Sequence, residues 1–205
     1  METSLCPCTL PIVISYDRNT ALVVVDVQND FADPKGSLFV EGGDTVVPRI
    51  NIEVMRALSA GSFVVYTQDW HPESTPHFET EGGIWPVHCV QGTWGAELHP
   101  GLEVSGPVVR KGSNGEDGYS GFTMRDPETG EETPTPLREM LQERGAQRVV
   151  VVGLALDVCV KATAMDATDD FETSVVADAS APVDVQPGDG RRALDELRSA
   201  GVAVV

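Results

Sequence analysis

The chain has 205 residues, a length that fits one domain with a sizeable hydrophobic core. Its 32 acidic residues outnumber its 14 basic ones and give a formal net charge of −18. Such a charge repels phosphate backbones and anionic lipid surfaces, so we expect neither nucleic-acid binding nor membrane-surface binding.

No apolar run approaches the ~18 residues of a membrane span, and the N-terminus lacks the basic and then apolar segments of a signal peptide. We therefore expect a cytoplasmic protein whose four cysteines are free thiols. Cys6 and Cys8 have no second cysteine pair that would complete a metal site. They lie in residues 1–20, which show no periodicity and are expected to form an irregular extension before one domain over residues 21–205.

The first expected strand is Ala21–Val25, an all-apolar stretch typical of a strand that is buried on both faces of a sheet. It runs directly into Asp26, where a dinucleotide-binding protein would carry a glycine-rich turn, so that class is disfavoured. At the end of a buried strand, Asp26 is either a partly desolvated carboxylate that can accept a proton or a carboxylate bonded to nearby amides. Both interpretations stay open at this point.

A loop marked by glycine and proline leads to an expected helix from about Asp44 to Ala60, which Gly61 ends. Its apolar face is expected to hold Val47, Ile50, Val54 and Leu58. The next strand is expected over Ser62–Thr67, and it also ends in polar residues.

The stretch from Gln68 to Pro100 has little periodicity, which for so long a loop indicates function or disorder. Within twenty residues of this stretch, Asp69 is joined by three of the four histidines of the chain, His71, His77 and His88. Asp69 and His71 can point to the same side of an extended segment, and the loop can fold back to bring the others beside them. Because imidazole with carboxylate suits Zn²⁺, Fe²⁺ or Mn²⁺, we expect a metal site, with solvated loop histidines as the alternative.

A short strand is expected over Pro107–Arg110, and Lys111 follows it at its carboxyl end. On its own this residue is most simply a solvated surface lysine. The next stretch, Gly112–Glu132, is rich in glycine and acidic residues and is expected to be a loop. A helix is expected over Thr135–Arg144, with Gly145 as its end.

Four consecutive valines, Val149–Val152, predict a second strand that is buried on both faces. A turn at Gly153 follows, and Asp157 is expected to be the N-cap of a helix with Val158, Ala162 and Met165 at helical spacing. Cys159 then lies in the first helical turn, where a helix N-terminus favours thiolate over thiol. It is either a nucleophile or an inert buried cysteine.

The chain closes with a strand at Glu172–Ala177, a helix at about Asp189–Ala200 with Leu194, Leu197 and Ala200 facing inward, and a strand at Val202–Val205. This alternation predicts an α/β fold: a single-domain, doubly wound, mostly parallel six-stranded sheet with helices on both faces. Asp26, Lys111 and Cys159 each follow a strand, so all three can meet in one crevice. They would supply a base, a cation that stabilises thiolate, and a nucleophile.

Several motifs from about Ala21 to the C-terminus together carry a family resemblance. They are Val24–Phe31 (Val-Val-Asp-Val-Gln-Asn-Asp-Phe), Thr67–Pro72 (Thr-Gln-Asp-Trp-His-Pro), Trp85–Cys89 (Trp-Pro-Val-His-Cys), Arg110–Gly112, Tyr119–Phe122 (Tyr-Ser-Gly-Phe) and Asp157–Val160. On these motifs the chain resembles the isochorismatase-like cysteine hydrolases, and within them the nicotinamidase/pyrazinamidase group.

The resemblance implies an amidohydrolase of pyridine nucleotide salvage that forms a cysteine thioester with nicotinamide, and also with pyrazinamide. It implies Asp26, Lys111 and Cys159 as the catalytic residues. It also implies one divalent ion, with Zn²⁺ as the first choice and Fe²⁺ or Mn²⁺ as alternatives, whose ligands are Asp69, His71, His77 and His88. It implies substrate binding by Phe31, Trp85, Tyr119 and Leu154. It also implies a cis peptide between Leu154 and Ala155, and an oxyanion hole formed by the amides of Ala155 and Cys159.

The chain departs from the family pattern at Leu156, where threonine is common, and at Val158, where an aromatic residue or histidine is common. A carbon–nitrogen hydrolase of the same family that acts on a carbamoyl or ureido amide is the nearest alternative, and it would need no ring-binding metal. A non-catalytic ligand-binding α/β module is a further alternative. A vinyl-ether hydrolase is disfavoured, because such relatives generally lack the nucleophilic cysteine. The expected partner is a small-molecule amide, and the oligomeric state stays open, a homo-oligomer included.

Overall fold

The computed structural model describes residues 14–205, and the predicted extension with Cys6 and Cys8 lies largely outside them. Its centre is one six-stranded sheet in which every neighbouring pair of strands is parallel. The strands follow in the order β3 (Val108–Lys111), β2 (Phe63–Asp69), β1 (Thr20–Val25), β6 (Arg148–Leu154), β7 (Glu172–Ala181) and β8 (Ala203–Val204). The predicted six-stranded α/β sheet is therefore confirmed.

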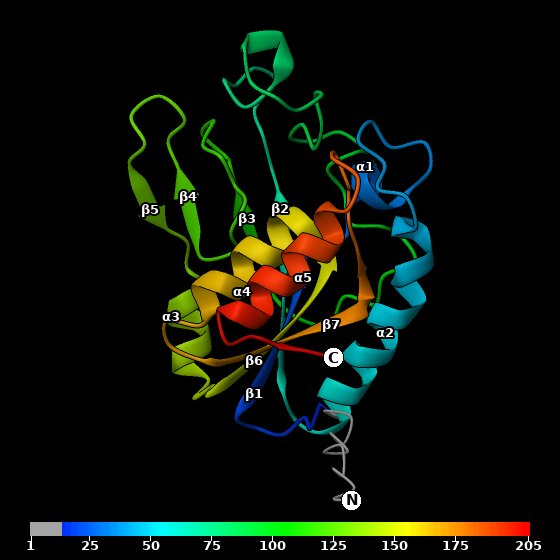
Figure 1. Ribbon diagram of the computed structural model, residues 1–205, viewed down its shortest axis with the longest axis vertical. Helices are drawn as coiled ribbons and strands as arrows, with labels where there is room; N and C mark the ends of the chain where they lie inside the picture. Colours follow the sequence, from blue (N-terminus) through cyan, green and yellow to red (C-terminus); the bar gives the residue numbers. More distant parts are fainter. Residues whose placement is uncertain (1–13) are drawn as a thin grey trace, which may run out of the picture.

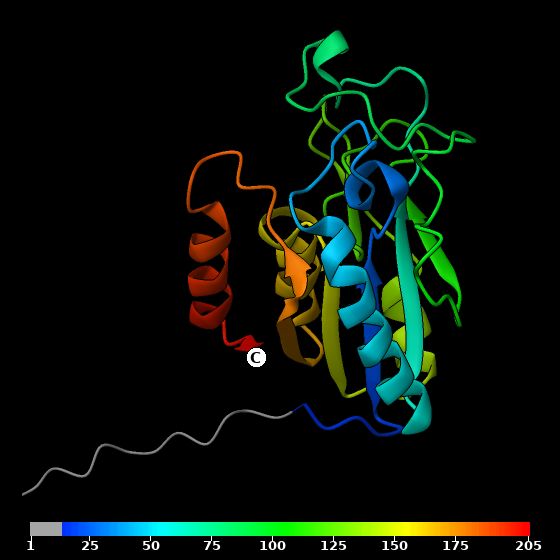
Figure 2. The same ribbon diagram turned by 90° about the vertical axis from the view of Figure 1, so that its right-hand side faces the viewer.

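Helices cover both faces of this sheet, as predicted. The short α1 (Asn29–Ala32) and the long α2 (Gly43–Ser59) lie on one face, and α2 runs in front of the sheet in Figure 2. The other face carries α3 (Leu137–Glu143), α4 (Lys161–Ala167) and α5 (Asp189–Ser199), which lie in front of the sheet in Figure 1. None of the helices in residues 14–205 has the length and apolarity that crossing a membrane requires.

The two central strands explain why the sheet is buried. Alternate side chains of β1 point to opposite faces: Leu22 and Val24 join the core under α2, while Ala21, Val23 and Val25 join the core under α3, α4 and α5. All five are fully buried. A strand between two helical layers needs apolar residues on both faces, which is the pattern that the sequence shows.

Three local predictions were wrong. Residues 112–132, expected to be loop, also contain the strand β4 (Thr123–Arg125), which pairs antiparallel with β5 (Glu132–Pro134). Each of these strands has three residues, which is too short for an alternating pattern to be recognised in the sequence. Leu58, placed on the apolar face of its helix, and Ala200, expected to face inward, are exposed. Met165, one of the residues noted at helical spacing, is exposed as well. In the helical segment that ends with α4, the side chains that pack into the core are instead those of Val160, Ala164 and Ala167.

Asp157 is not a helix N-cap. The helical segment begins as a π-helix, η2 (Leu156–Val160), with Ala155 in the cap position, and continues as α4. The Asp157 carboxylate instead accepts hydrogen bonds from the backbone N–H groups of Val183 and Asp184, at 2.9 Å each. It thereby holds the segment with Cys159 against the loop that follows β7.

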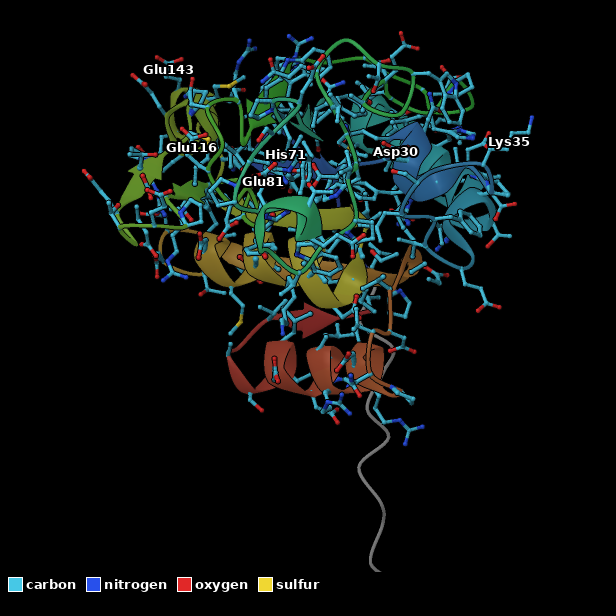
Figure 3. The ribbon with its side chains drawn as sticks, turned by 90° about the horizontal axis from the view of Figure 1, so that it is seen from above. Asp30, Lys35, His71, Glu81, Glu116 and Glu143 are labelled. Carbon is cyan, nitrogen blue, oxygen red and sulfur yellow. The ribbon has the colours of Figure 1, made fainter. Side chains whose placement is uncertain are left out.

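The carboxyl ends of the parallel strands meet at one edge, at the top of Figure 1. Over this edge lie the loop between β2 and β3, with the short 3₁₀ helix η1 (Glu79–Glu81), and the β4–β5 hairpin. Seen from above in Figure 3, His71 lies near the centre of this end of the molecule and Lys35 lies at its rim. Such an edge is where open α/β sheets bind ligands.

Candidate active site

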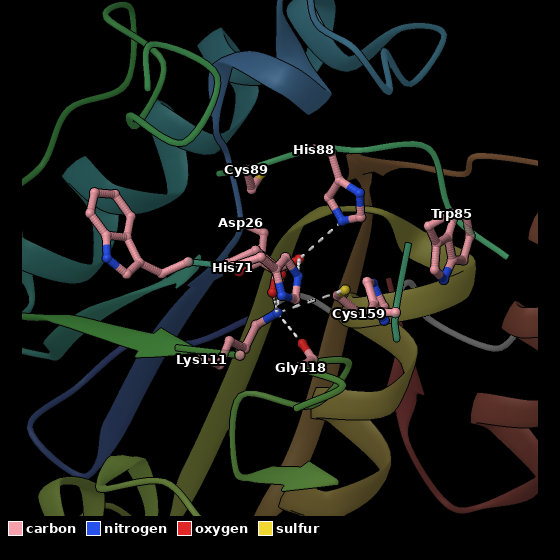
Figure 4. Close-up of polar contacts among 12 residues, drawn as sticks. Asp26, His71, Trp85, His88, Cys89, Lys111, Gly118 and Cys159 are labelled. Atoms are coloured by element: carbon pink, nitrogen blue, oxygen red, sulfur yellow. Dashed lines mark hydrogen bonds and ion pairs between the residues drawn. The ribbon is translucent and has the colours of Figure 1, made fainter. Parts of the chain in front are cut away.

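Lys111 is the centre of a buried cluster of charged groups. Its Nζ lies 2.7 Å from Asp26 Oδ2 and 2.5 Å from Asp69 Oδ1, donates to the carbonyl oxygen of Gly118, and lies 3.9 Å from Cys159 Sγ (Figure 4). The structure therefore brings Asp26, Lys111 and Cys159 together. The solvated-lysine alternative for Lys111 is wrong, because the residue is fully buried.

The sheet itself sets this geometry. Asp69 and Lys111 are the last residues of the adjacent strands β2 and β3, and they are partners in the parallel register. Asp26 follows β1, with its backbone in the left-handed region at φ 48° and its Oδ1 accepting a hydrogen bond from Thr67 Oγ1 at 2.6 Å. Asp69 was expected in a loop, but its position in β2 fixes its carboxylate beside Lys111.

Burial and the neighbouring charges set the protonation states of the cluster. Burial raises the pKa of Asp26 to about 6, even though the Lys111 ammonium opposes this rise. For Lys111, burial would lower the pKa, but the carboxylates of Asp26 and Asp69 raise it well above its ordinary value. At pH 7 the cluster thus holds an ammonium and a carboxylate that titrates near neutrality.

Cys159 rests as a thiol, which corrects the expectation that its helix would favour the thiolate. Burial raises the pKa of Cys159 well above its ordinary value, and the attraction of Lys111 for the thiolate only partly offsets this. A carboxylate oxygen of Asp26 and one of Asp69 lie within 4.8 Å of the Cys159 sulfur and of each other. The thiol therefore has a base within reach but needs that base to become a nucleophile.

The three loop histidines face one another beside this cluster. One nitrogen from each of His71, His77 and His88 lies within 4.8 Å of the other two. The second carboxylate oxygen of Asp69, Oδ2, lies 3.8 Å from His71 Nε2 and 3.9 Å from His88 Nε2. The four residues predicted as metal ligands are therefore brought together.

The donor atoms of this group fit a divalent cation. Neither nitrogen of His71 has a hydrogen-bond partner among the described residues, although the side chain is fully buried. His88 donates from Nδ1 to the carbonyl oxygen of Pro86 at 2.7 Å, which leaves Nε2 free, and burial lowers the pKa of His88 to about 4. A neutral imidazole such as that of His88, beside a carboxylate that Lys111 keeps ionised, is what transition-metal ions bind.

The carboxylate of Asp69 serves both clusters. Burial would raise its pKa, but the Lys111 ammonium and then the imidazoles hold the pKa of Asp69 well below its usual range. Its Oδ1 contacts Lys111 and its Oδ2 faces the histidines. Gln28 fixes the backbone of Asp69 from both sides, since its side chain donates to the Asp69 carbonyl and accepts from the Asp69 N–H, each at 2.8 Å.

A cavity with about 410 Å³ of empty volume, counting the part open to solvent, is lined by His77 and His88 and also by Cys159. Phe31, Trp85 and Tyr119, three of the residues with a predicted role in substrate binding, line it, and Trp85 Nε1 donates to the Tyr119 hydroxyl at 3.0 Å. The fourth, Leu154, does not line it, because its side chain is fully buried in the core under α2. The remaining wall is aliphatic and includes Leu38, Val40, Val158 and Val183.

Two backbone features belong to the segments that carry the site. The Leu154–Ala155 peptide is cis, where the resemblance implied it. Gly112 has φ 75°, and a Cβ there would lie 2.6 Å from His71 Cε1, so the glycine after Lys111 lets the chain pass the histidine.

The sequence did not reveal several residues of the site. Leu38, Val40 and Val183 come from loops without a motif, and Asp117, whose Oδ1 lies 2.6 Å from His77 Nδ1, stands in an acidic stretch that was expected to be plain loop. Gln28 and Thr67 lie inside the recognised motifs, but only the neighbouring strands show what they contact.

Comparison with known proteins agrees with this geometry. A family model described as isochorismatase domain matches residues 20–205. The nicotinamidase of Acinetobacter baylyi is 37% identical over 213 residues, which cover 94% of this chain and 95% of that one.

Two solved structures resemble most of the chain. The pyrazinamidase of Pyrococcus horikoshii in complex with zinc has a TM-score of 0.80 and 38% identity, over 91% of this chain and 98% of that chain. PnC1 from L. infantum in complex with nicotinate has a TM-score of 0.84 and 38% identity, over 95% of this chain and 96% of that chain. The chain therefore belongs to the isochorismatase family, as its motifs predicted.

Proposed function

We propose that this protein is an amidohydrolase that converts nicotinamide to nicotinate and ammonia, and that it also accepts pyrazinamide. One observation carries the proposal: a buried thiol, a carboxylate and an ammonium meet beside a cavity that has aromatic walls, and three facing imidazoles lie next to them. The nicotinamidase and pyrazinamidase relatives support the choice of substrate.

Catalysis begins with proton transfer from the Cys159 thiol to the Asp26 carboxylate, and the sulfur attacks the amide carbonyl carbon. The oxygen of the resulting tetrahedral intermediate is stabilised by the N–H groups of Ala155 and Cys159, and each such donor contributes typically ~3 kcal/mol. Lys111 holds Asp26 in place and balances the negative charge that passes between carboxylate and sulfur. The two roles of Lys111 follow from the distances of its Nζ to Asp26 Oδ2 and to Cys159 Sγ.

The intermediate collapses as the carbon–nitrogen bond breaks, and ammonia leaves with the proton that Asp26 took from the thiol. Asp26 then takes a proton from water, whose oxygen attacks the thioester carbonyl. The carbon–sulfur bond breaks, the sulfur regains a proton from Asp26, and nicotinic acid leaves and loses its remaining proton to solvent as nicotinate. Asp26 acts as a base and then as an acid in both halves, which suits a pKa near the working pH.

Asp69, His71, His77 and His88 would hold one divalent ion, for which zinc is the first choice. When bound, it would supply an electron-pair acceptor for the ring nitrogen of the substrate. Phe31, Trp85 and Tyr119 would enclose the aromatic ring, and the aliphatic wall would exclude water around it.

The test is ammonia release from nicotinamide by the purified protein, before and after treatment with a chelator. We expect turnover with nicotinamide, loss of most of that turnover after chelation, and its recovery on adding zinc. A protein that releases ammonia from carbamoyl or ureido amides but not from nicotinamide would contradict the proposal and would favour the alternative hydrolase.

The pH dependence of kcat/KM tests the role of Asp26. Its carboxylate must be ionised to take the thiol proton, so kcat/KM is expected to fall about tenfold per pH unit below about pH 6 and to level off above it. Asp26→Asn should lower kcat/KM by about 10²- to 10⁴-fold and abolish this acidic limb. An acidic limb that persists unchanged in Asp26→Asn would assign the titration to another group.

A further inference from the structure

Asp117 makes the only side-chain contact in residues 14–205 that fixes a ring nitrogen of His77. Its Oδ1 lies 2.6 Å from His77 Nδ1, and both side chains are largely buried, with 14% and 4% exposed. An ionised carboxylate only accepts hydrogen bonds, so this contact favours the His77 tautomer that donates from Nδ1. In the neutral ring this leaves the electron pair of Nε2 as the atom that can bind a ligand.

A comparison with His88 shows why this contact matters. His88 is fixed in the same way, but by a carbonyl oxygen two residues away, that of Pro86. His77 has no such local acceptor for its ring, and its partner comes from a segment forty residues later. The ring orientation of His77 therefore depends on a contact between two separate loops.

The backbone around Asp117 is held firmly. Its N–H donates to the carbonyl oxygen of Arg125 at 2.7 Å, and the Arg125 N–H donates back at 3.0 Å, so the segment is anchored to β4 of the hairpin. The carbonyl oxygen of the next residue, Gly118, accepts from Lys111 Nζ, and the hydroxyl of Tyr119 accepts from Trp85. Three consecutive residues thus touch the histidine cluster, the catalytic cation and the cavity wall.

We propose that Asp117 is a positioning residue that orients His77, so that Nε2 faces the other two imidazoles and can bind a divalent ion. This inference rests on the proposed metal site and adds to it a residue that no motif of the sequence indicated. A carboxylate behind a metal-binding imidazole fixes its tautomer and its direction and makes it a stronger donor. The expected cost of losing such a partner is about 10- to 100-fold in metal affinity.

The first test measures zinc affinity of the full chain by competition with a chromophoric chelator. Asp117→Ala is expected to weaken zinc binding about 10- to 100-fold. The zinc affinity of Asp117→Asn is expected to lie between those of the parent and Asp117→Ala, because the amide oxygen can still accept a hydrogen bond from His77 Nδ1. Glu116→Ala is the matched control, because it removes the same charge one residue away. Within residues 14–205 that carboxylate accepts side-chain and backbone hydrogen bonds from Asn114 and none from a histidine, so the affinity should stay within about twofold of the parent.

The second test reads the tautomer directly, in metal-free protein at pH 8, from the nitrogen NMR signals of the histidine rings. His77 should carry its proton on Nδ1 in the parent and in Asp117→Asn, and should lose this preference in Asp117→Ala. A loss of structure alone would not select this one ring, and the unchanged signals of His88 serve as the internal reference.

The outcomes separate this inference from the proposed function. If the parent binds no zinc, the metal site and the role of Asp117 both fail. If the parent binds zinc and Asp117→Ala binds it equally tightly, or if His77 carries its proton on Nε2 in the metal-free parent, only the role of Asp117 is overturned.

Discussion

Replacing Cys159 with alanine is expected to lower ammonia release from nicotinamide by roughly 10⁴- to 10⁶-fold, because no other group near the cavity can form the thioester. The sulfur is the one nucleophile that adjoins both Lys111 and the cavity in the described part of the chain. The change removes only the side-chain sulfur atom from a buried position and leaves Asp69 and the histidines in place. Zinc binding should therefore stay within a few-fold of the parent.

Cys89 offers the matched control. It is also a fully buried free cysteine, its pKa is also raised by burial, and none of the proposed steps uses it. Cys89→Ala should keep kcat/KM within a few-fold of the parent. A Cys159→Ala protein that still turns over nicotinamide at a comparable rate would remove the covalent route from the proposed mechanism.

Replacing Lys111 with methionine is expected to lower the free energy of unfolding by about 3–5 kcal/mol and to abolish turnover. Methionine has a similar length, but the change leaves the carboxylates of Asp26 and Asp69 buried without the ammonium that both contact. Urea unfolding at pH 7 measures the loss of stability. Lys161→Met is the control: this lysine is partly exposed and pairs with an exposed Glu196, so less than about 1 kcal/mol should be lost.

A double variant separates stability from catalysis. Asp26→Asn combined with Lys111→Met removes one buried negative charge together with the positive one, so most of the lost stability should return. Turnover should not return, because both the base and the cation are then missing. A Lys111→Met protein as stable as the parent would contradict the view that this lysine balances two buried carboxylates.

The main architecture could be predicted from local sequence. Ala21–Val25 and Val149–Val152 are strands between two helical layers, and only apolar residues are stable there, so the composition of each stretch already determines its place in the sheet. Parallel strands bring their carboxyl ends to one edge, which is why residues after separate strands could be expected to converge. Asp26, Lys111 and Cys159 do converge.

How these groups act on one another depends on contacts between distant parts of the folded chain. From its place at a helix N-terminus, Cys159 was expected to favour the thiolate. Burial, with the carboxylates of Asp26 and Asp69 nearby, instead raises the pKa of Cys159 and keeps the sulfur protonated. Asp69 joins two clusters because β2 and β3 are in register. Asp117 reaches His77 because two loops meet across forty residues of sequence.

Local sequence was thus enough to predict the sheet, the edge at which the site lies and the residue types that gather there, since the apolar composition of a stretch and the polar residues at its end can be recognised from neighbouring residues alone. The partners of each side chain, and with them its protonation state and orientation, were decided by the folded chain. Hydrogen bonds and burial depend on which distant atoms lie within about 3 Å, and no local pattern encodes that distance.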